Sequence, residues 1–263
     1  MINPSPYRRG DRPALMGILN VTPDSFSDGG RWNSPDAARE HVFSMLAHGA
    51  DMIDVGGEST RPGATPVSEE DELSRVIPAL KAFAGSVSVP VSVDTMKASV
   101  ARASVEAGAT IINDVSSLAD PLMAETAAEL DVPIILMNSF GTSGTFKTEF
   151  MPGDGIDYVI TRLQNLVDRA LDAGVKEKNI ILDPGLGFGT TTEQCMNMVR
   201  HSSVYSLGKY PVLIGPSRKR FVKEVYSGRD VDEATADVCV LAAQSGADIL
   251  RVHNVACVAR RFA

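Results

Sequence analysis

The chain has 263 residues, which suits one α/β barrel or two smaller domains, and its net charge of −8 argues against a nucleic-acid binder that neutralises phosphates. Cys195, Cys239 and Cys257 lie far apart without a CxxC motif, so we expect reduced thiols rather than a disulfide framework. No apolar run approaches the roughly 18 residues of a membrane span, and the start lacks the apolar core of a signal peptide, so we expect a cytoplasmic protein with no membrane partner.

A single pattern repeats along the chain after a polar, irregular lead-in at residues 1–13. Each unit has a short apolar run, a polar residue, a loop and a helical stretch. The predicted strands are residues 14–20, 51–56, 91–95, 111–115, 133–138, 180–183, 212–215 and 248–253. The predicted helices are residues 34–49, 68–83, 97–107, 121–130, 158–173, 192–207, 217–226 and 232–246, with a short tail after the last strand.

Alternating strands and helices imply a parallel sheet, and eight such units close naturally into a (β/α)₈ TIM barrel. We therefore predict one α/β barrel domain over residues 1–263. An open doubly wound sheet is the alternative, although no GxGxxG turn follows the first strand. Working residues of such barrels lie at the carboxyl ends of the strands, which here carry Asn20, Asp94, Asn113, Asp183, Arg251 and His253.

Two carboxylates and an amide form the first chemical set, Asp94, Asn113 and Asp183. Because a carboxylate accepts two neighbouring donors, this set can recognise a flat heterocycle with adjacent ring N–H and amino groups. Capping of nearby loops or helices is one alternative, and a divalent metal cluster is another. The lack of several histidines beside the acids argues against zinc.

The second set suits an anion with many oxygens, such as a diphosphate: Thr60, Arg61, Arg251 and His253, with Asn20 beside them. A Mg²⁺ ion could bridge that anion, with Asn20 supplying one neutral oxygen. A solvated loop charge is the alternative for Arg61. Arg251 differs, because it lies inside an apolar strand where an unpaired charge would be costly.

Two further features need an explanation. Residues 217–220 (SRKR) place three cations in the first turn of a predicted helix, against the helix dipole, so anion or carbonyl recognition is favoured over a basic surface run. Phe26 is an aromatic residue in a polar, glycine-rich loop at residues 21–33. Anchoring of that loop in a local cluster is the structural explanation for Phe26.

The chain resembles the dihydropteroate synthase family at seven motifs that occur in order along nearly all of its length. The first two are long and specific, whereas each shorter motif alone would be weak. They are residues 17–30 (GILNVTPDSFSDGG), 54–63 (DVGGESTRPG), 92–95 (SVDT), 112–115 (INDV), 183–189 (DPGLGFG), 217–219 (SRK) and 251–253 (RVH).

The resemblance implies a barrel, commonly homodimeric, that joins 6-hydroxymethyl-7,8-dihydropterin diphosphate to 4-aminobenzoate and releases diphosphate with Mg²⁺. It implies that the pterin is held by Asp94, Asn113, Asp183 and Lys219, above a floor near Met137. It implies that the diphosphate and its metal are held by Asn20, Thr60, Arg61, Arg251 and His253. The loops that carry Phe26 and Pro62 would close over the aminobenzoate beside Phe188. The catalytic residues would be Asp94, Lys219, Arg251 and His253.

Four positions depart from the family pattern. Thr190 stands where lysine is usual, residues 137–141 (MNSFG) replace MHMQG, Arg220 replaces a serine, and Asn254 replaces an aspartate. They motivate a competing hypothesis, a pterin-binding paralogue without condensation activity. A methyltransferase that passes a methyl group to a corrinoid is a third, although it would need neither the anion set nor the Phe26 loop. We expect the side chain of Arg220 to point outward.

Overall fold

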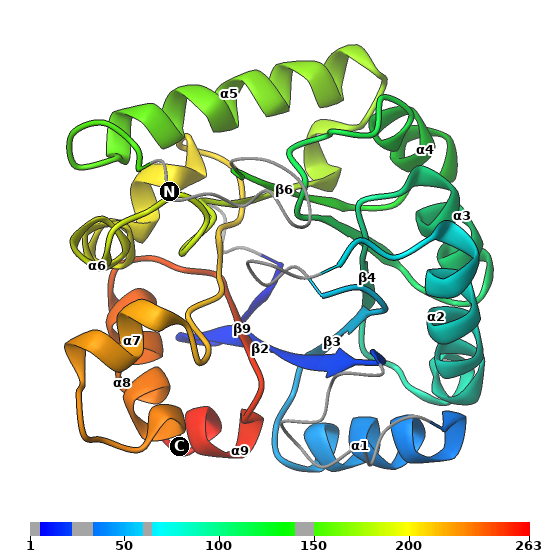
Figure 1. Ribbon diagram of the computed structural model, residues 1–263, viewed down its shortest axis with the longest axis horizontal. Helices are drawn as coiled ribbons and strands as arrows, with labels where there is room; N and C mark the ends of the chain where they lie inside the picture. Colours follow the sequence, from blue (N-terminus) through cyan, green and yellow to red (C-terminus); the bar gives the residue numbers. More distant parts are fainter. Residues whose placement is uncertain (1–5, 23–33, 60–64, 140–149) are drawn as a thin grey trace.

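Eight parallel strands form the wall of a barrel, surrounded by a ring of helices (Figure 1). The structure is a computed structural model that describes residues 6–22, 34–59, 65–139 and 150–263. The parallel strands are β2 (Arg12–Asn20), β3 (Met52–Gly56), β4 (Val91–Asp94), β5 (Ile111–Asp114), β6 (Ile134–Met137), β7 (Ile180–Asp183), β8 (Leu213–Ile214) and β9 (Ile249–Val252). Most are short runs of buried aliphatic residues, as expected for strands covered on both faces.

The strands follow one another around the barrel in the order β7-β6-β5-β4-β3-β2-β9-β8. A parallel bridge between Leu182 of β7 and Val212, just before β8, joins the two ends of this path. The predicted TIM barrel is therefore confirmed, and the open doubly wound alternative is wrong.

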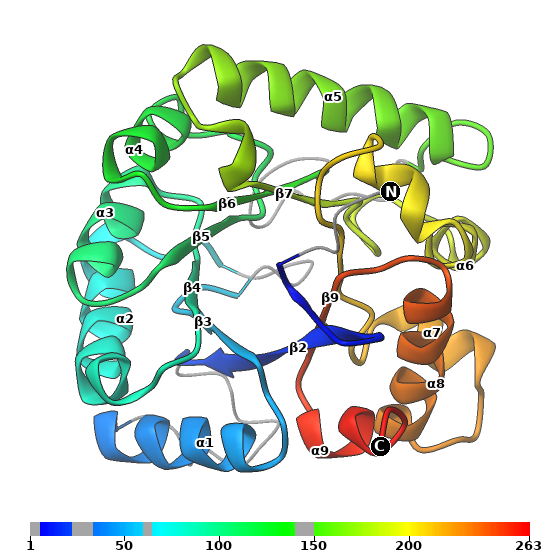
Figure 2. The ribbon, with the colours of Figure 1, turned by 180° about the vertical axis from the view of Figure 1, so that it is seen from behind.

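Figures 1 and 2 show the helices in chain order around the outside of the barrel. They are α1 (Pro35–Ala47), α2 (Glu69–Phe83), α3 (Ala98–Glu106), α4 (Met123–Leu130), α5 (Ile156–Asp172), α6 (Thr192–Arg200), α7 (Arg220–Val225), α8 (Val231–Gln244) and α9 (Val255–Ala259). Polar caps set several of their starts: the hydroxyl of Ser34 accepts from the backbone of Ala37, and Thr191 and Gln194 form a capping box. None of the helices in the described ranges is long and apolar enough to cross a membrane.

The pairing register divides the barrel interior into an apolar half and a polar half. The apolar half is a buried cluster of Ala14, Met16, Met52, Ile111, Ile135, Ile181, Leu213 and Ile249. One or two steps further toward the carboxyl ends, the inward positions are Asn20, Asp54, Asp94, Asn113, Met137, Asp183 and Arg251. Because side chains alternate along a strand, the same register that closes the core also gathers these residues, all of which except Met137 are polar.

Two predictions about the chain ends were wrong. The described part of the lead-in is not irregular, because β1 (Arg8–Arg9) pairs antiparallel with the start of β2 through a turn at Gly10. This hairpin places Tyr7 against the apolar cluster inside the barrel. The expected tail after the last strand is helix α9, capped by Asn254.

Two other predicted helices are shorter than expected. The helix predicted at residues 192–207 ends at Arg200 and is followed by a 3₁₀ helix, Ser202–Ser206. The helix predicted to begin at residue 217 begins at Arg220, so Arg218 and Lys219 belong to the preceding loop. The supposed conflict of three cations with the helix dipole is thereby reduced to Arg220 alone.

Candidate active site

Arg251 points into the barrel and bonds two carboxylates from neighbouring strands. Its Nε lies 2.5 Å from Oδ2 of Asp54, and its Nη2 lies 2.5 Å from Oδ2 of Asp94. Burial alone would lower the pKa of Arg251, but Asp54 and Asp94 raise it overall, so the guanidinium remains charged. The two acids explain how an apolar strand accommodates this cation.

Asp54 organises the centre of this network and was missed as a candidate from the sequence. Its side chain is fully buried and accepts hydrogen bonds from Arg251, from the hydroxyl of Ser92 at 2.5 Å, and from the amide of Asn113 at 3.2 and 3.3 Å. The available signal was an acid inside the apolar strand Met52–Gly56, which is the same signal that singled out Arg251. Asp54 thus connects Asn113, which was predicted to bind a heterocycle, with Arg251, which was predicted to bind an anion.

Asp94 presents one oxygen that the surrounding side chains leave unused. Its Oδ2 is bonded to Arg251, whereas its Oδ1 is buried without a hydrogen-bond partner in the described part of the chain. A buried acceptor without a donor is costly, so this oxygen is suited to an N–H group of a ligand. Burial raises the pKa of Asp94 to about 7, with Arg251 opposing and Asp54 reinforcing the rise.

Asp183 and Lys219 form a second group across the mouth of the barrel. Oδ1 of Asp183 accepts the backbone N–H of Gly185 at 2.7 Å, and burial raises the pKa of this carboxyl against the effect of Lys219. Nζ of Lys219 donates to the carbonyl of Leu186 and lies 4.6 Å from the centre of the Phe188 ring. Burial lowers the pKa of Lys219 to about 8, although the negative charge of Asp183 opposes this.

Met137 supplies an apolar surface in the same layer as Asp183. The two residues are register partners on β6 and β7, and Met137 is buried. The turn after β7 is close-packed against β6, because a Cβ on Gly185 would lie 1.8 Å from the carbonyl oxygen of Asn138. A flat ligand above Met137 would therefore meet the carboxylate of Asp183 at its edge.

His253 and Asn20 lie at the rim, where the anion set was predicted. Oγ of Ser217 accepts the backbone N–H of His253 at 3.1 Å and lies 2.9 Å from its Nδ1, which fixes the imidazole. Asn20 ends β2 beside Gly56, and a Cβ on that glycine would lie 3.7 Å from Oδ1 of Asn20 and 3.5 Å from Cβ of Asp94. The glycine therefore leaves open space between the amide oxygen and the carboxylate.

Four of the predicted residues, Phe26, Thr60, Arg61 and Pro62, lie outside the described residues. The chain on both sides of residues 60–64 is held by an ion group whose two acids are buried. Nζ of Lys97 lies 2.5 Å from Oε2 of Glu58 and 2.6 Å from Oε2 of Glu72, and Glu58 also accepts the backbone N–H of Val67 at 3.3 Å.

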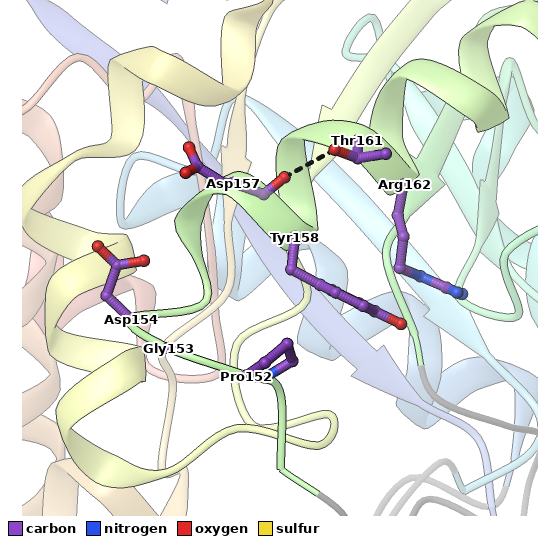
Figure 3. A pocket seen from close by; sticks show the side chains of 7 residues that line it. All are labelled: Pro152, Gly153, Asp154, Asp157, Tyr158, Thr161 and Arg162. Atoms are coloured by element: carbon purple, nitrogen blue, oxygen red, sulfur yellow. Dashed lines mark hydrogen bonds between the residues drawn. The ribbon is translucent and has the colours of Figure 1, made fainter.

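A separate surface hollow of about 470 Å³ lies at the start of α5 and contains none of the predicted site residues (Figure 3). Its lining includes Asp154, Asp157, Tyr158 and Arg162. Arg162 also reaches the end of β6, where its Nε donates to Oδ1 of Asn138 at 2.8 Å. The converging polar groups at the barrel mouth, rather than this hollow, form the candidate active site.

Comparison with known proteins agrees with the geometry. Residues 16–253 match the family described as pterin binding enzyme. The dihydropteroate synthase of Bacillus subtilis is 46% identical over 260 residues, which cover 98% of this chain and 89% of that protein. The chain belongs to the dihydropteroate synthase family.

Solved structures of the dihydropteroate synthase family have the same fold. The Xanthomonas albilineans enzyme with 4-aminobenzoic acid has a TM-score of 0.87 and 40% identity, covering 95% of this chain and 91% of that one. The Yersinia pestis enzyme in a sulfonamide drug complex has a TM-score of 0.89 and 40% identity over the same shares. The resemblance predicted from the motifs is confirmed.

Two departures from the dihydropteroate synthase pattern are satisfied locally. Thr190 accepts the backbone N–H of Gly187 at 2.8 Å and lies 3.0 Å from Sγ of Cys195. Asn138 is fully buried; besides the bond from Arg162, its amide donates to the carbonyl of Pro184 at 3.1 Å. Both side chains therefore stabilise the turn after β7 through hydrogen bonds to its backbone.

The other two departures also have partners. The side chain of Arg220 is 67% exposed and lies 3.4 Å from Glu224 one helical turn along, so the expected outward orientation is confirmed. Asn254 accepts the backbone N–H of Cys257 at 3.0 Å and donates to Asp232 at 2.9 Å.

Proposed function

We propose that the chain is a dihydropteroate synthase, which condenses 6-hydroxymethyl-7,8-dihydropterin diphosphate with 4-aminobenzoate and releases diphosphate in folate biosynthesis. The observation that carries the proposal is the buried, unpartnered Oδ1 of Asp94 at the mouth of the barrel. Asp183 and Lys219 accompany it at the mouth, and each shifts the pKa of the other in favour of its charged form.

The pterin would bind by its ring edges. Asp94 and Asp183 accept ring N–H and amino donors, while Lys219 donates to a ring carbonyl or nitrogen. Asn113 would contribute beside them, with its amide nitrogen held by both oxygens of Asp54. Met137 forms the apolar floor, and Phe188 lies where the second substrate would approach.

The reaction needs charge stabilisation rather than an enzyme nucleophile. The carbon–oxygen bond to diphosphate breaks early and leaves a resonance-stabilised pterin cation, whose charge the Asp94 carboxylate offsets. Arg251 and His253, with Thr60 and Arg61, stabilise the negative charge on the departing group. Exclusion of water would keep the cation available for the weakly nucleophilic aromatic amine, a role that the resemblance gives to the loops with Phe26 and Pro62.

Mg²⁺ is part of the proposal. The described residues contain no group of three or more His, Cys, Asp or Glu arranged to hold a metal. Mg²⁺ binds through few protein oxygens and takes its other ligands from substrate phosphates and water. Asn20 would supply the protein oxygen, and bound Mg²⁺ would neutralise charge on the diphosphate. We further propose a homodimer that works in the cytoplasm.

The test is direct synthesis. Purified protein is incubated with the pterin diphosphate, Mg²⁺ and 4-aminobenzoate, and dihydropteroate is sought by mass, with each component omitted in turn. A paralogue without condensation activity would bind the pterin in a calorimeter but yield no product. Release of methyl groups to a corrinoid without release of diphosphate would support the methyltransferase hypothesis instead.

A further inference from the structure

Two loops at the mouth of the barrel bond the same carboxylate. Lys219 belongs to the loop after β8 and His253 to the loop after β9, and the residue next to each of them reaches Asp232 near the start of α8. Arg218 donates from Nε to Oδ1 at 2.8 Å and from Nη2 to Oδ2 at 3.0 Å. Asn254 donates to the same Oδ2 at 2.9 Å.

Arg218 and Asp232 form a bidentate ion pair. Paired, nearly parallel hydrogen bonds between a guanidinium and a carboxylate fix orientation as well as adding energy. These bonds from Arg218 lower the pKa of Asp232, and Asn254 and the charge of His253 lower it further. The carboxylate is therefore ionised at neutral pH and also acts electrostatically on His253.

The backbone of Arg218 needs such an anchor. Its φ is +58°, in the left-handed region that residues other than glycine rarely adopt because of steric strain. Its N–H donates to the hydroxyl of Thr235, also on α8, at 3.2 Å. This conformation directs the next residue, Lys219, across the mouth to the carbonyl of Leu186.

The amide at residue 254 matches this arrangement. Its oxygen caps α9 and its nitrogen donates to Asp232. An aspartate at 254 could still cap the helix, but its second oxygen would face the carboxylate of Asp232 with no proton between them. Asn254 and Asp232 therefore form a matched pair in this chain.

We infer that Asp232 is a positioning residue, which orients Lys219 and His253 by bonding Arg218 and Asn254 with one carboxylate. The inference rests on the proposed function for its kinetic readout. Asp232 acts through the two loops and does not itself bind the substrate. Exchange of the charge between residues 232 and 254 should therefore be tolerated better than either single change.

The experiment compares Asp232→Asn, Asn254→Asp and the double variant. We expect each single variant to lower kcat/KM for the pterin diphosphate at least tenfold. The double variant should recover to within about threefold of the original protein, because Arg218 and Asn254 both bond Oδ2 of Asp232 and a carboxylate at 254 would therefore be close to the same guanidinium. The KM for 4-aminobenzoate should change less than threefold throughout.

Asp237→Asn is the matched control. Asp237 is on the same helix and pairs with Arg229 at 2.6 Å and Arg261 at 3.0 Å, away from both loops. Its thermal midpoint should fall by about as much as that of Asp232→Asn, while its kcat/KM should stay unchanged. If Asp232→Asn does not fold, the comparison of Asn254→Asp with the double variant still decides.

The inference is overturned if Asp232→Asn keeps kcat/KM within twofold, or if the double variant is as impaired as the worse single variant. If the original protein makes no dihydropteroate, the proposed function fails separately. Titration of inorganic diphosphate with Mg²⁺ then replaces kinetics: weaker binding in both single variants and recovery in the double variant support the positioning role, and equal binding in all four proteins refutes it.

Discussion

Arg251 and Asp94 are joined across the mouth of the barrel, with Nη2 2.5 Å from Oδ2, and this bond leaves the other oxygen of Asp94 for a ligand. The guanidinium cannot swing away easily, because its Nε is held by the fully buried Asp54. The direction of the unused oxygen is thus fixed before any ligand arrives. Preorganisation of this kind is what a site needs when charge must be stabilised at the moment of reaction.

We expect kcat/KM for the pterin diphosphate to be bell-shaped in pH. Asp94 must be ionised, and its pKa is about 7, so activity should rise through that pH. Lys219 must be protonated, and its pKa is about 8, so activity should fall above that pH. Steady-state rates across pH 5.5 to 9.5 provide the measurement, and Lys219→Arg should remove the alkaline fall.

Neither limb should come from unfolding through these groups. The folded pKa of Lys219 is below its ordinary 10.5, so from about pH 8 upward the unfolded chain binds more protons and stability rises. The folded pKa of Asp94 is above its ordinary 3.8, so its contribution to stability grows as pH falls below about 7. Loss of activity in step with the thermal midpoint would contradict the assignment.

Asp183→Ala should weaken pterin binding by about 2–4 kcal/mol, because buried ring donors would lose their acceptor. The variant also removes the bond to the backbone of Gly185, so its thermal midpoint must be followed in parallel. Calorimetric titration with a pterin measures the effect. Asp131→Ala is the control, since that acid is exposed and pairs with Lys176 on the outside. Unchanged affinity in Asp183→Ala would remove Asp183 from the site.

Gly185→Ala should be strongly destabilising, and a second glycine separates the two causes. Gly185 has φ +78° and its added Cβ would lie 1.8 Å from the carbonyl oxygen of Asn138. Gly228 has φ +81° but nothing within 4 Å, so Gly228→Ala carries only the conformational cost, on the order of 1 kcal/mol. Denaturant unfolding of both variants measures the difference. Equal losses would mean that the turn after β7 shifts freely.

The barrel could be predicted because each of its strands is a short aliphatic run, which can be recognised from neighbouring residues alone. The polar residues at the mouth of the barrel could also be predicted, since parallel strands present their carboxyl ends together. The hairpin before β2 was missed because Arg8 and Arg9 carry no apolar alternation, and only Tyr7 marks its contact with the core.

Ion-pair and hydrogen-bond partners that are distant in the sequence could not be predicted from the sequence pattern. Asp54 and Arg251 are separated by 197 residues, and each alone was only an unexplained charge in an apolar strand. Asp232 carried no signal at all, because an acid in the first turn of a helix is explained by the helix dipole. Its bonds to Arg218 and Asn254 depend on how α8 packs beside two loops.

Arg220 stands where the family usually has serine, and the resemblance places the carboxylate of 4-aminobenzoate near that position. Its side chain is 67% exposed and pairs with Glu224 within the same short helix, a contact that contributes little at a surface. Arg220→Ser should therefore leave the KM for 4-aminobenzoate within about threefold, less than 1 kcal/mol. Arg220→Ala serves as the second variant, because it separates loss of the guanidinium from the new hydroxyl. A tenfold or larger rise in that KM for both variants would show that the guanidinium turns inward when the substrate binds, and that this chain uses Arg220 in place of the serine that is usual in the family.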